Sequence, residues 1–121
     1  MIYLASPYSS PDPAVREARF KAACQAAAGL LLYGKLVFSP IAHSHPLTAY
    51  GLGGGFEDWC TWNTWFISRC EELWVLMLDG WKESTGVTAE TAIARALGKP
   101  TYYVEPSDWG AIHGIEITET S

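Results

Sequence analysis

Residues 73–104 read LWVLMLDGWKESTGVTAETAIARALGKPTYYV, and this stretch decides the fold class. The continuous apolar run over 73–78 is typical of a central strand of a parallel sheet, which is buried on both faces. Beyond a short turn, apolar residues at helical spacing predict a helix over 87–97 that ends before Gly98, and a second strand follows at 100–104. This order of strand, helix and strand predicts two parallel strands joined by a helical crossover. The stretch therefore places the chain in the α/β class.

The amino-terminal part of the chain repeats this alternation. A short apolar run predicts a buried strand over 2–5. Asp12 and Pro13 then supply an N-cap and a first-turn proline for a helix that extends to about Tyr33, and another strand follows at 36–38. We therefore expect a Rossmann-like (flavodoxin-like) fold, with a parallel sheet of four to five strands and helices on both faces.

The remaining segments connect or follow these elements. Residues 41–56 are rich in Gly, His and Pro, and they predict a long loop, which in so small a domain is usually functional. Its glycines at 51–55 predict a flexible lid, because they lack the following lysine of a phosphate-binding P-loop. A helix is predicted over 57–70. In the carboxyl-terminal tail, residues 115–117 favour an edge strand.

Composition limits the partners of the chain. The length suits a single domain over residues 1–121, and 49% hydrophobic with 17% charged residues excludes a disordered chain. A net charge of -5 without a Lys/Arg cluster argues against a nucleic acid polymer as partner. No apolar stretch approaches the ~20 residues that span a bilayer, so no membrane association is expected. The three cysteines lack CxxC spacing, and the amino terminus does not resemble a signal peptide; both favour a cytoplasmic protein.

The turn before the helix at 87–97 is the most informative for chemistry. In parallel sheets ligands bind outside the carboxyl ends of the strands, where this turn is expected to lie. Ser84 and Gly86 begin the helix, whose free amides and dipole suit a phosphate. Glu90 lies one turn further on the same face, and we expect it to be ionised and to face the same pocket. The alternative is that Ser84 is only an N-cap and Glu90 an exposed charge.

Two motifs give the chain a recognisable resemblance. They are YLASPYS at residues 3–9 and the spacing Ser-x-Gly-Val-x-x-Glu, which starts at Ser84 and ends at Glu90. With these motifs the sequence resembles the nucleoside 2-deoxyribosyltransferase-like superfamily, close to its small bacterial and phage branch. The resemblance covers about residues 1–104 and implies a single domain of that type.

The resemblance implies cleavage of an N-glycosidic bond. The glutamate that matches Glu90 attacks C1′ of the sugar and forms a glycosyl-enzyme, which water or a second base then resolves. The serine and glycine that match Ser84 and Gly86 hold a 5′-phosphate in the branch that hydrolyses nucleotides. We therefore expect a hydrolase of a (deoxy)nucleoside 5′-monophosphate, with no cofactor and no metal. A nucleoside deoxyribosyltransferase and a non-catalytic nucleotide-binding module remain as alternatives.

One position departs from the pattern of the superfamily. Its usual aspartate, which orients the sugar and helps to protonate the leaving base, is matched here by Asn63. An amide can hydrogen-bond a sugar hydroxyl, but it cannot act as a general acid. Asp58 and Asp79 are the local substitutes, and we expect Asp79 to be the better placed, because it follows the strand at 73–78 directly.

Other residues complete the predicted site. Ser6, Pro7 and Tyr8 follow the first strand and are expected to wall the pocket. Arg19 either reaches the pocket from the first helix or is solvated. His45, two residues after His43, is expected to contact the base or to hydrogen-bond within its loop, rather than to bind a metal.

Three tryptophans recur at helical spacing in the segment 57–70. Trp59, Trp62 and Trp65 share approximately one helical face, which is typical of a core or a subunit interface. The alternative is the base-stacking wall of a ligand pocket. Because the core is small and members of the resembled superfamily complete their sites across subunits, we expect a homodimer or homotetramer.

Overall fold

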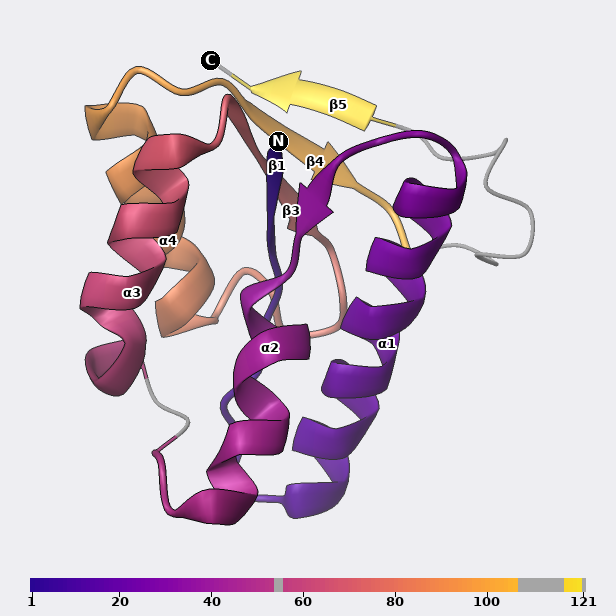
Figure 1. The fold of residues 1–121 in the computed structure, drawn as a ribbon, viewed down its shortest axis with the longest axis vertical. Coiled ribbons are helices and arrows are strands. Elements are labelled where there is room, and N and C mark those ends of the chain that lie inside the picture. Colours follow the sequence, from indigo (N-terminus) through magenta and orange to yellow (C-terminus); the bar gives the residue numbers. More distant parts are fainter. Residues whose placement is uncertain (54–55, 107–116, 121) are drawn as a thin grey trace.

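A central sheet of five strands, in the order β2-β1-β3-β4-β5, carries the fold (Figure 1). The computed structural model describes residues 1–53, 56–106 and 117–120. The strands are β1 (Ile2–Ala5), β2 (Val37–Phe38), β3 (Glu72–Leu76), β4 (Thr101–Val104) and β5 (Ile117–Thr120). The helices are α1 (Pro13–Leu32), α2 (Pro40–Leu47), α3 (Phe56–Arg69) and α4 (Thr85–Ala96), with a 3-10 turn at Thr48–Tyr50.

The four strands β1 to β4 are all parallel, which confirms the predicted α/β, Rossmann-like class. The fifth strand differs, because β5 pairs with β4 in the antiparallel direction at the edge of the sheet. The predicted edge strand therefore exists, although residues 115 and 116 lie outside the described part of the chain. Strands β2 and β3 lie on opposite sides of β1, so the direction in which strands are added to the sheet reverses there. Ligands bind at such a switch point in open α/β sheets.

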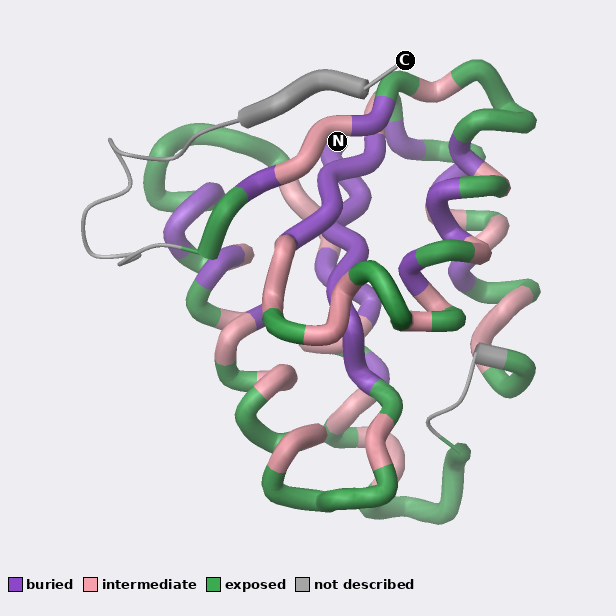
Figure 2. Tube along the Cα trace, turned by 180° about the vertical axis from the view of Figure 1, so that it is seen from behind, coloured by how far each residue is buried: buried purple, intermediate pink, exposed green. Residues whose placement is uncertain are grey.

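Strand β1 shows why both faces of the sheet must be covered. Its four residues are all buried, and successive side chains point to opposite faces. Tyr3 and Ala5 belong to the core cluster that α3 and α4 cover, whereas Ile2 and Leu4 belong to the cluster that α1 covers. Helices accordingly lie on both sides of the sheet (Figure 1), and buried residues concentrate along the strands and the inward faces of the helices (Figure 2).

The predicted loop over 41–56 is wrong for most of its length. Residues 40–47 form the helix α2, and the 3-10 turn follows it. The physical reason is an N-cap: the Ser39 hydroxyl accepts a hydrogen bond of 3.2 Å from the amide of Ala42, and Pro40 occupies the first turn. Proline ends a strand, but it also suits the first turn of a helix, where its missing N–H is not needed. Of the predicted lid, residues 54 and 55 lie outside the described residues.

The other helices agree with the sequence more closely. Asp12 caps α1 as predicted, because its carboxylate accepts a hydrogen bond of 2.9 Å from the amide of Ala14. Gly98 has a positive φ of 71° directly after α4, which is the conformation expected of a residue that ends a helix. Within the described ranges, no helix combines the length and the apolar character needed to cross a bilayer.

Candidate active site

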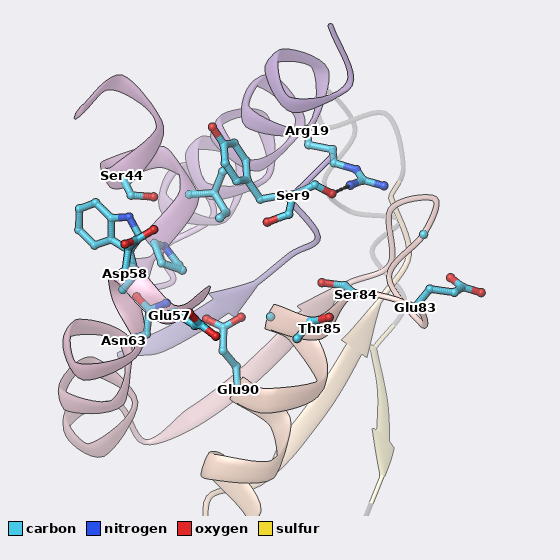
Figure 3. A pocket seen from close by; sticks show the side chains of 16 residues that line it. Ser9, Arg19, Ser44, Glu57, Asp58, Asn63, Glu83, Ser84, Thr85 and Glu90 are labelled. Carbon is cyan, nitrogen blue, oxygen red and sulfur yellow. Dashed lines mark hydrogen bonds between the residues drawn. The ribbon is translucent and has the colours of Figure 1, made fainter. Parts of the chain in front are cut away.

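A cavity of about 590 Å³ lies where the loop after β1, the first turn of α4, and helices α2 and α3 meet. Its volume falls within the range of roughly 300–1,000 Å³ that is typical of small-molecule sites. The side chains that line it come from α1, α2, α3 and α4 and from the loops after β1 and β3 (Figure 3). The structure thus brings together segments that are distant in the sequence, as the switch point of the sheet requires.

Glu90 is the buried acid of this cavity. It is only 5% exposed, and this burial raises the pKa of its carboxyl group to about 7. The hydroxyl of Tyr3 donates a hydrogen bond to Oε2 of Glu90, which opposes the effect of burial and lowers the pKa. Burial has the larger effect, because water that would solvate a charge is excluded. Glu90 is therefore only partly ionised in the free protein at neutral pH.

Tyr3 is itself fully buried in β1. Burial, followed by the nearby charge of Glu90, raises the pKa of its phenol well above the usual value. The phenol therefore keeps its proton in the physiological range and can donate it in a hydrogen bond to the ionised Glu90.

The first turn of α4 forms one end of the cavity. Ser84 is its N-cap, and its Oγ accepts a hydrogen bond of 3.2 Å from the amide of Val87. The amides of Thr85 and Gly86 begin the helix and have no acceptor within it. A Cβ built on Gly86 would lie 3.8 Å from Oγ of Ser84 and 4.0 Å from Oε1 of Glu90, so it would occupy the space between them. Glycine leaves that space open to a ligand.

Arg19 lines the cavity at the same end, so it reaches the site rather than solvent alone. Its guanidinium donates hydrogen bonds to the carbonyl of Ser9 at 2.9 Å and to the carbonyl of Asp79 at 3.1 Å. Gly80 approaches it so closely that a Cβ there would lie 2.6 Å from Nη2 of Arg19. Because carbonyls do not neutralise the guanidinium, and no carboxylate in the described residues pairs with it, its positive charge remains available to an anion.

The opposite end of the cavity is formed by α3. Glu57, Asp58 and Trp59 line it from the first turn, and Asn63 lines it one turn further on. Asn63 is only 8% exposed, and its Oδ1 has no hydrogen-bond partner in the described residues. The structure therefore places Asn63 at the same cavity as Glu90 (Figure 3).

The two aspartates proposed as substitutes for the missing acid differ in position. Asp58 lines the cavity, whereas the exposed side chain of Asp79 does not. Asp79 meets the site only through its backbone carbonyl, which accepts from Arg19. The expectation that Asp79 is the better placed is therefore not met, because the turn after β3 directs its side chain out of the cavity.

Tyr8 lines the cavity, and its hydroxyl is part of a hydrogen-bond network with His45 and Glu17. Its hydroxyl lies 2.6 Å from Nδ1 of His45, whose Nε2 lies 2.7 Å from Oε2 of Glu17. Phe20 stacks on the imidazole with the ring centroids 4.3 Å apart. His45 does not line the cavity, so it positions Tyr8, which agrees with a structural hydrogen bond rather than a base contact.

Ser6 and Pro7 are buried and do not line the cavity, so the expectation that they wall the pocket is not met. They support the wall that Tyr8 and Ser9 form. Among the tryptophans, Trp59 lines the cavity, whereas Trp62 and Trp65 lie outside it and are 39% and 53% exposed. Trp62 stacks on His43 with a centroid distance of 5.0 Å.

Within the described residues, no group of three or more His, Cys, Asp or Glu side chains is arranged to hold a metal ion. The residues of the cavity thus offer the buried acid Glu90, three further carboxyl groups, a helix start, one cation and an aromatic wall. These are groups that bind an organic anion and can act on it as acid, base or nucleophile.

Comparison with known proteins gives the family of the chain. The model of a family described as "Domain of unknown function (DUF1937)" matches residues 1–105, which include β1 to β4 and all the residues that line the cavity. The chain belongs to this family. No curated protein matches the chain.

Sequence reasoning missed several residues of this DUF1937 site, Tyr3 above all. A tyrosine inside a short buried strand looks like core, and its partner Glu90 is 87 positions away. Its hydroxyl could have indicated a polar partner nearby, because a buried tyrosine usually has a hydrogen-bond partner. Glu57 and Ser44 were missed as well, since their approach to the cavity depends on the directions of α3 and α2.

The raised pKa of Glu90 predicts how stability depends on pH. In the unfolded chain the carboxyl group loses its proton near pH 4.5, whereas in the fold it keeps it up to about 7. Stability therefore falls as the pH rises through this window, because the folded state binds more protons than the unfolded state. Glu90→Gln has no charge to bury, so above pH 7 it should be more stable than wild type by about 3 kcal/mol.

Urea unfolding of both proteins at pH 8 and at pH 4.5 measures this difference, which should vanish at the lower pH. Glu105→Gln, at an exposed position outside the cavity, is the matched control and should show no gain. A variant Glu90→Gln that is less stable than wild type at pH 8 would contradict the assignment.

Proposed function

We propose that the protein hydrolyses the N-glycosidic bond of a nucleoside 5′-monophosphate, with Glu90 as nucleophile. The observation that carries the proposal is the position of Glu90, which is buried in the cavity between a helix start and an aromatic wall. A structural carboxylate is normally exposed or paired with a cation. Glu90 is neither within the described residues, and its one hydrogen bond, from Tyr3, leaves Oε1 directed to the side of Gly86.

The proposed reaction has two steps. An ionised oxygen of Glu90 attacks C1′ of the sugar while the bond from C1′ to the base breaks, and its electron pair passes to the base nitrogen. Water then attacks C1′ and releases the sugar 5-phosphate, which restores the carboxylate of Glu90 and liberates one proton. The transition states resemble an oxocarbenium ion, which a nearby carboxylate stabilises.

The first turn of α4 supports the assignment of a 5′-phosphate. The Ser84 hydroxyl has its own proton left to donate, since its oxygen accepts from Val87. The amides of Thr85 and Gly86 and the charge of Arg19 add to a site that suits an anion. A phosphate held there would direct the sugar towards Glu90, which lies on the same face of the helix.

Further parts of the proposal rest on the sequence alone. They are membership of the nucleoside 2-deoxyribosyltransferase-like superfamily, a cytoplasmic location, and a homodimer or homotetramer that buries the exposed Trp62 and Trp65. Each stays a prediction.

The activity can be tested with a panel of ribo- and deoxyribonucleoside 5′-monophosphates, with release of free base as the readout. We expect wild type to release base and Glu90→Gln to bind the nucleotide without turnover. Because Glu90 must be ionised to attack and its pKa is about 7, kcat/KM should rise with pH through this value. Near wild-type turnover by Glu90→Gln would exclude the covalent mechanism.

The same assay separates the alternatives. Exchange of the sugar onto an added acceptor base would indicate a transferase, and binding without base release from any substrate would indicate a binding module.

Ser84 tests the phosphate assignment. Ser84→Asp keeps the N-cap of α4, because aspartate caps helices as well as serine does, but it places a negative charge against the phosphate. We expect an unchanged melting temperature and a KM for the monophosphate that rises roughly ten- to a hundredfold. Ser84→Ala should also raise KM, with about 1 kcal/mol of lost stability. Equal losses on the unphosphorylated nucleoside, which lacks the group concerned, would contradict the assignment.

Substitution of Asn63 tests whether a general acid at this position would speed the release of neutral bases. Asn63→Asp should place a second carboxyl group in the cavity of Glu90, and the titrations of the two groups should separate so that one stays protonated. The variant should release neutral bases faster than wild type, by about tenfold or more and most visibly below pH 7. An unchanged rate and pH profile would show that position 63 does not face the leaving base.

A further inference from the structure

Three helices, α2, α3 and α4, begin at the cavity, and the first turns of α3 and α4 carry opposite charge patterns. The first turn of α4 has no acidic residue, so the positive end of its dipole is free for an anion. The first turn of α3 carries Glu57 and Asp58, and both line the cavity. Neither carboxylate has an ion-pair partner within the described residues. The α3 end is therefore negative, and of these two ends the α4 end suits a phosphate.

The charged side chains that line the cavity favour a ligand that carries both a negative and a positive charge. Four carboxyl groups line the cavity, at Glu57, Asp58, Glu83 and Glu90, against the single guanidinium of Arg19. Glu83 points away from the other labelled side chains, whereas Glu57, Asp58 and Asn63 lie on the side of Glu90 opposite to Ser84 and Arg19 (Figure 3). A ligand whose only charge is a phosphate would meet repulsion from this side, which a positive charge near α3 would turn into attraction.

Asn63 gives independent support for an electropositive ligand at this end. Asn63 lines the cavity, and its buried Oδ1 has no donor in the described residues. A buried acceptor without a partner is costly, so a ligand that presents electropositive ring hydrogens or N–H groups there is favoured. The indole of Trp59 beside it offers a face that attracts cations as well as flat rings.

The chemistry of the leaving group also favours a positively charged base. A neutral base departs with an electron pair and needs a proton, which the amide of Asn63 cannot supply. A base that is positively charged while glycosylated takes the same electron pair into its ring and departs neutral, with no proton transferred. Asn63 is then a suitable residue at this position, and Glu90 remains the only group that must change its covalent state.

We propose that the cavity takes a nucleoside 5′-monophosphate whose glycosylated base carries a fixed positive charge, such as a pyridinium or an N-alkylated purine. The phosphate lies at the α4 end with Ser84 and Arg19, and the charged ring lies at the α3 end with Asp58 and Asn63. This inference rests on the proposed function for the reaction, but the preference in binding does not depend on turnover.

Binding to the Glu90→Gln variant tests the preference without chemistry. The probes are two matched pairs: nicotinamide mononucleotide with its neutral dihydro form, and 7-methylguanosine 5′-monophosphate with guanosine 5′-monophosphate. Calorimetry should show the charged member of each pair binding about tenfold more tightly. Adding Glu57→Gln and Asp58→Asn should reduce the ratio to about one, whereas adding the exposed Glu105→Gln should not change it.

Base release by the wild-type protein is measured as well, so that the binding preference and the proposed hydrolysis can be judged separately. Equal or tighter binding of the neutral members, or a preference that survives loss of both α3 carboxylates, would overturn the inference, even if wild type hydrolyses neutral nucleotides as the proposed function requires. Preferential binding of the charged members without any base release would uphold the inference and refute the proposed hydrolysis instead.

Discussion

The hydrogen bond from Tyr3 to Glu90 is the contact on which the site depends. It joins the middle of β1 to the second turn of α4, and both residues are buried. A carboxyl group at this depth is stable only while it keeps its proton or has a donor, and Tyr3 supplies the donor. The same contact fixes the rotation of α4 about its axis, so that Gly86 and Glu90 face the cavity together. One polar pair within an apolar layer thus positions both the proposed nucleophile and the helix start that suits a phosphate.

The starts of α3 and α4 contribute to the cavity in two different ways. In α4 an uncharged N-cap, Ser84, satisfies one amide and leaves the others and the dipole for a ligand. In α3 the residues Glu57 and Asp58 offset the dipole of their own helix and give the opposite wall a negative charge. Because both helices pack on the same face of the sheet, these two ends are held at a fixed separation by the core beneath them. The polarity of the site therefore follows from the fold and from the composition of two short turns.

Features that depend on a short stretch of sequence could be predicted, whereas contacts that depend on the direction of the helices could not. The alternation of strands and helices gave the fold class, and Asp12–Pro13 located the start of α1. Ser39–Pro40 has the same pattern at the start of α2, but an eight-residue helix that contains Pro46 and two histidines has little intrinsic helix propensity, and packing against α1 supplies its stability. Ser84, Gly86 and Glu90 lie within seven residues, so the helical period alone predicts their shared face. Tyr3 and Asp58 belong to other elements, and only the tertiary structure shows that Tyr3 hydrogen-bonds Glu90 and that Asp58 rather than Asp79 lines the cavity.

The close approach of Arg19 and Gly80 links two positions that are 61 residues apart in the chain. Gly80 has a φ of 90°, which glycine adopts without strain, and the space its side chain would fill is occupied by the guanidinium. A side chain at 80 would be strained at this φ and would displace Arg19 from the carbonyls of Ser9 and Asp79, which it links across the loops that follow β1 and β3. Among DUF1937 sequences, glycine should therefore be kept at the second position wherever arginine stands at the first.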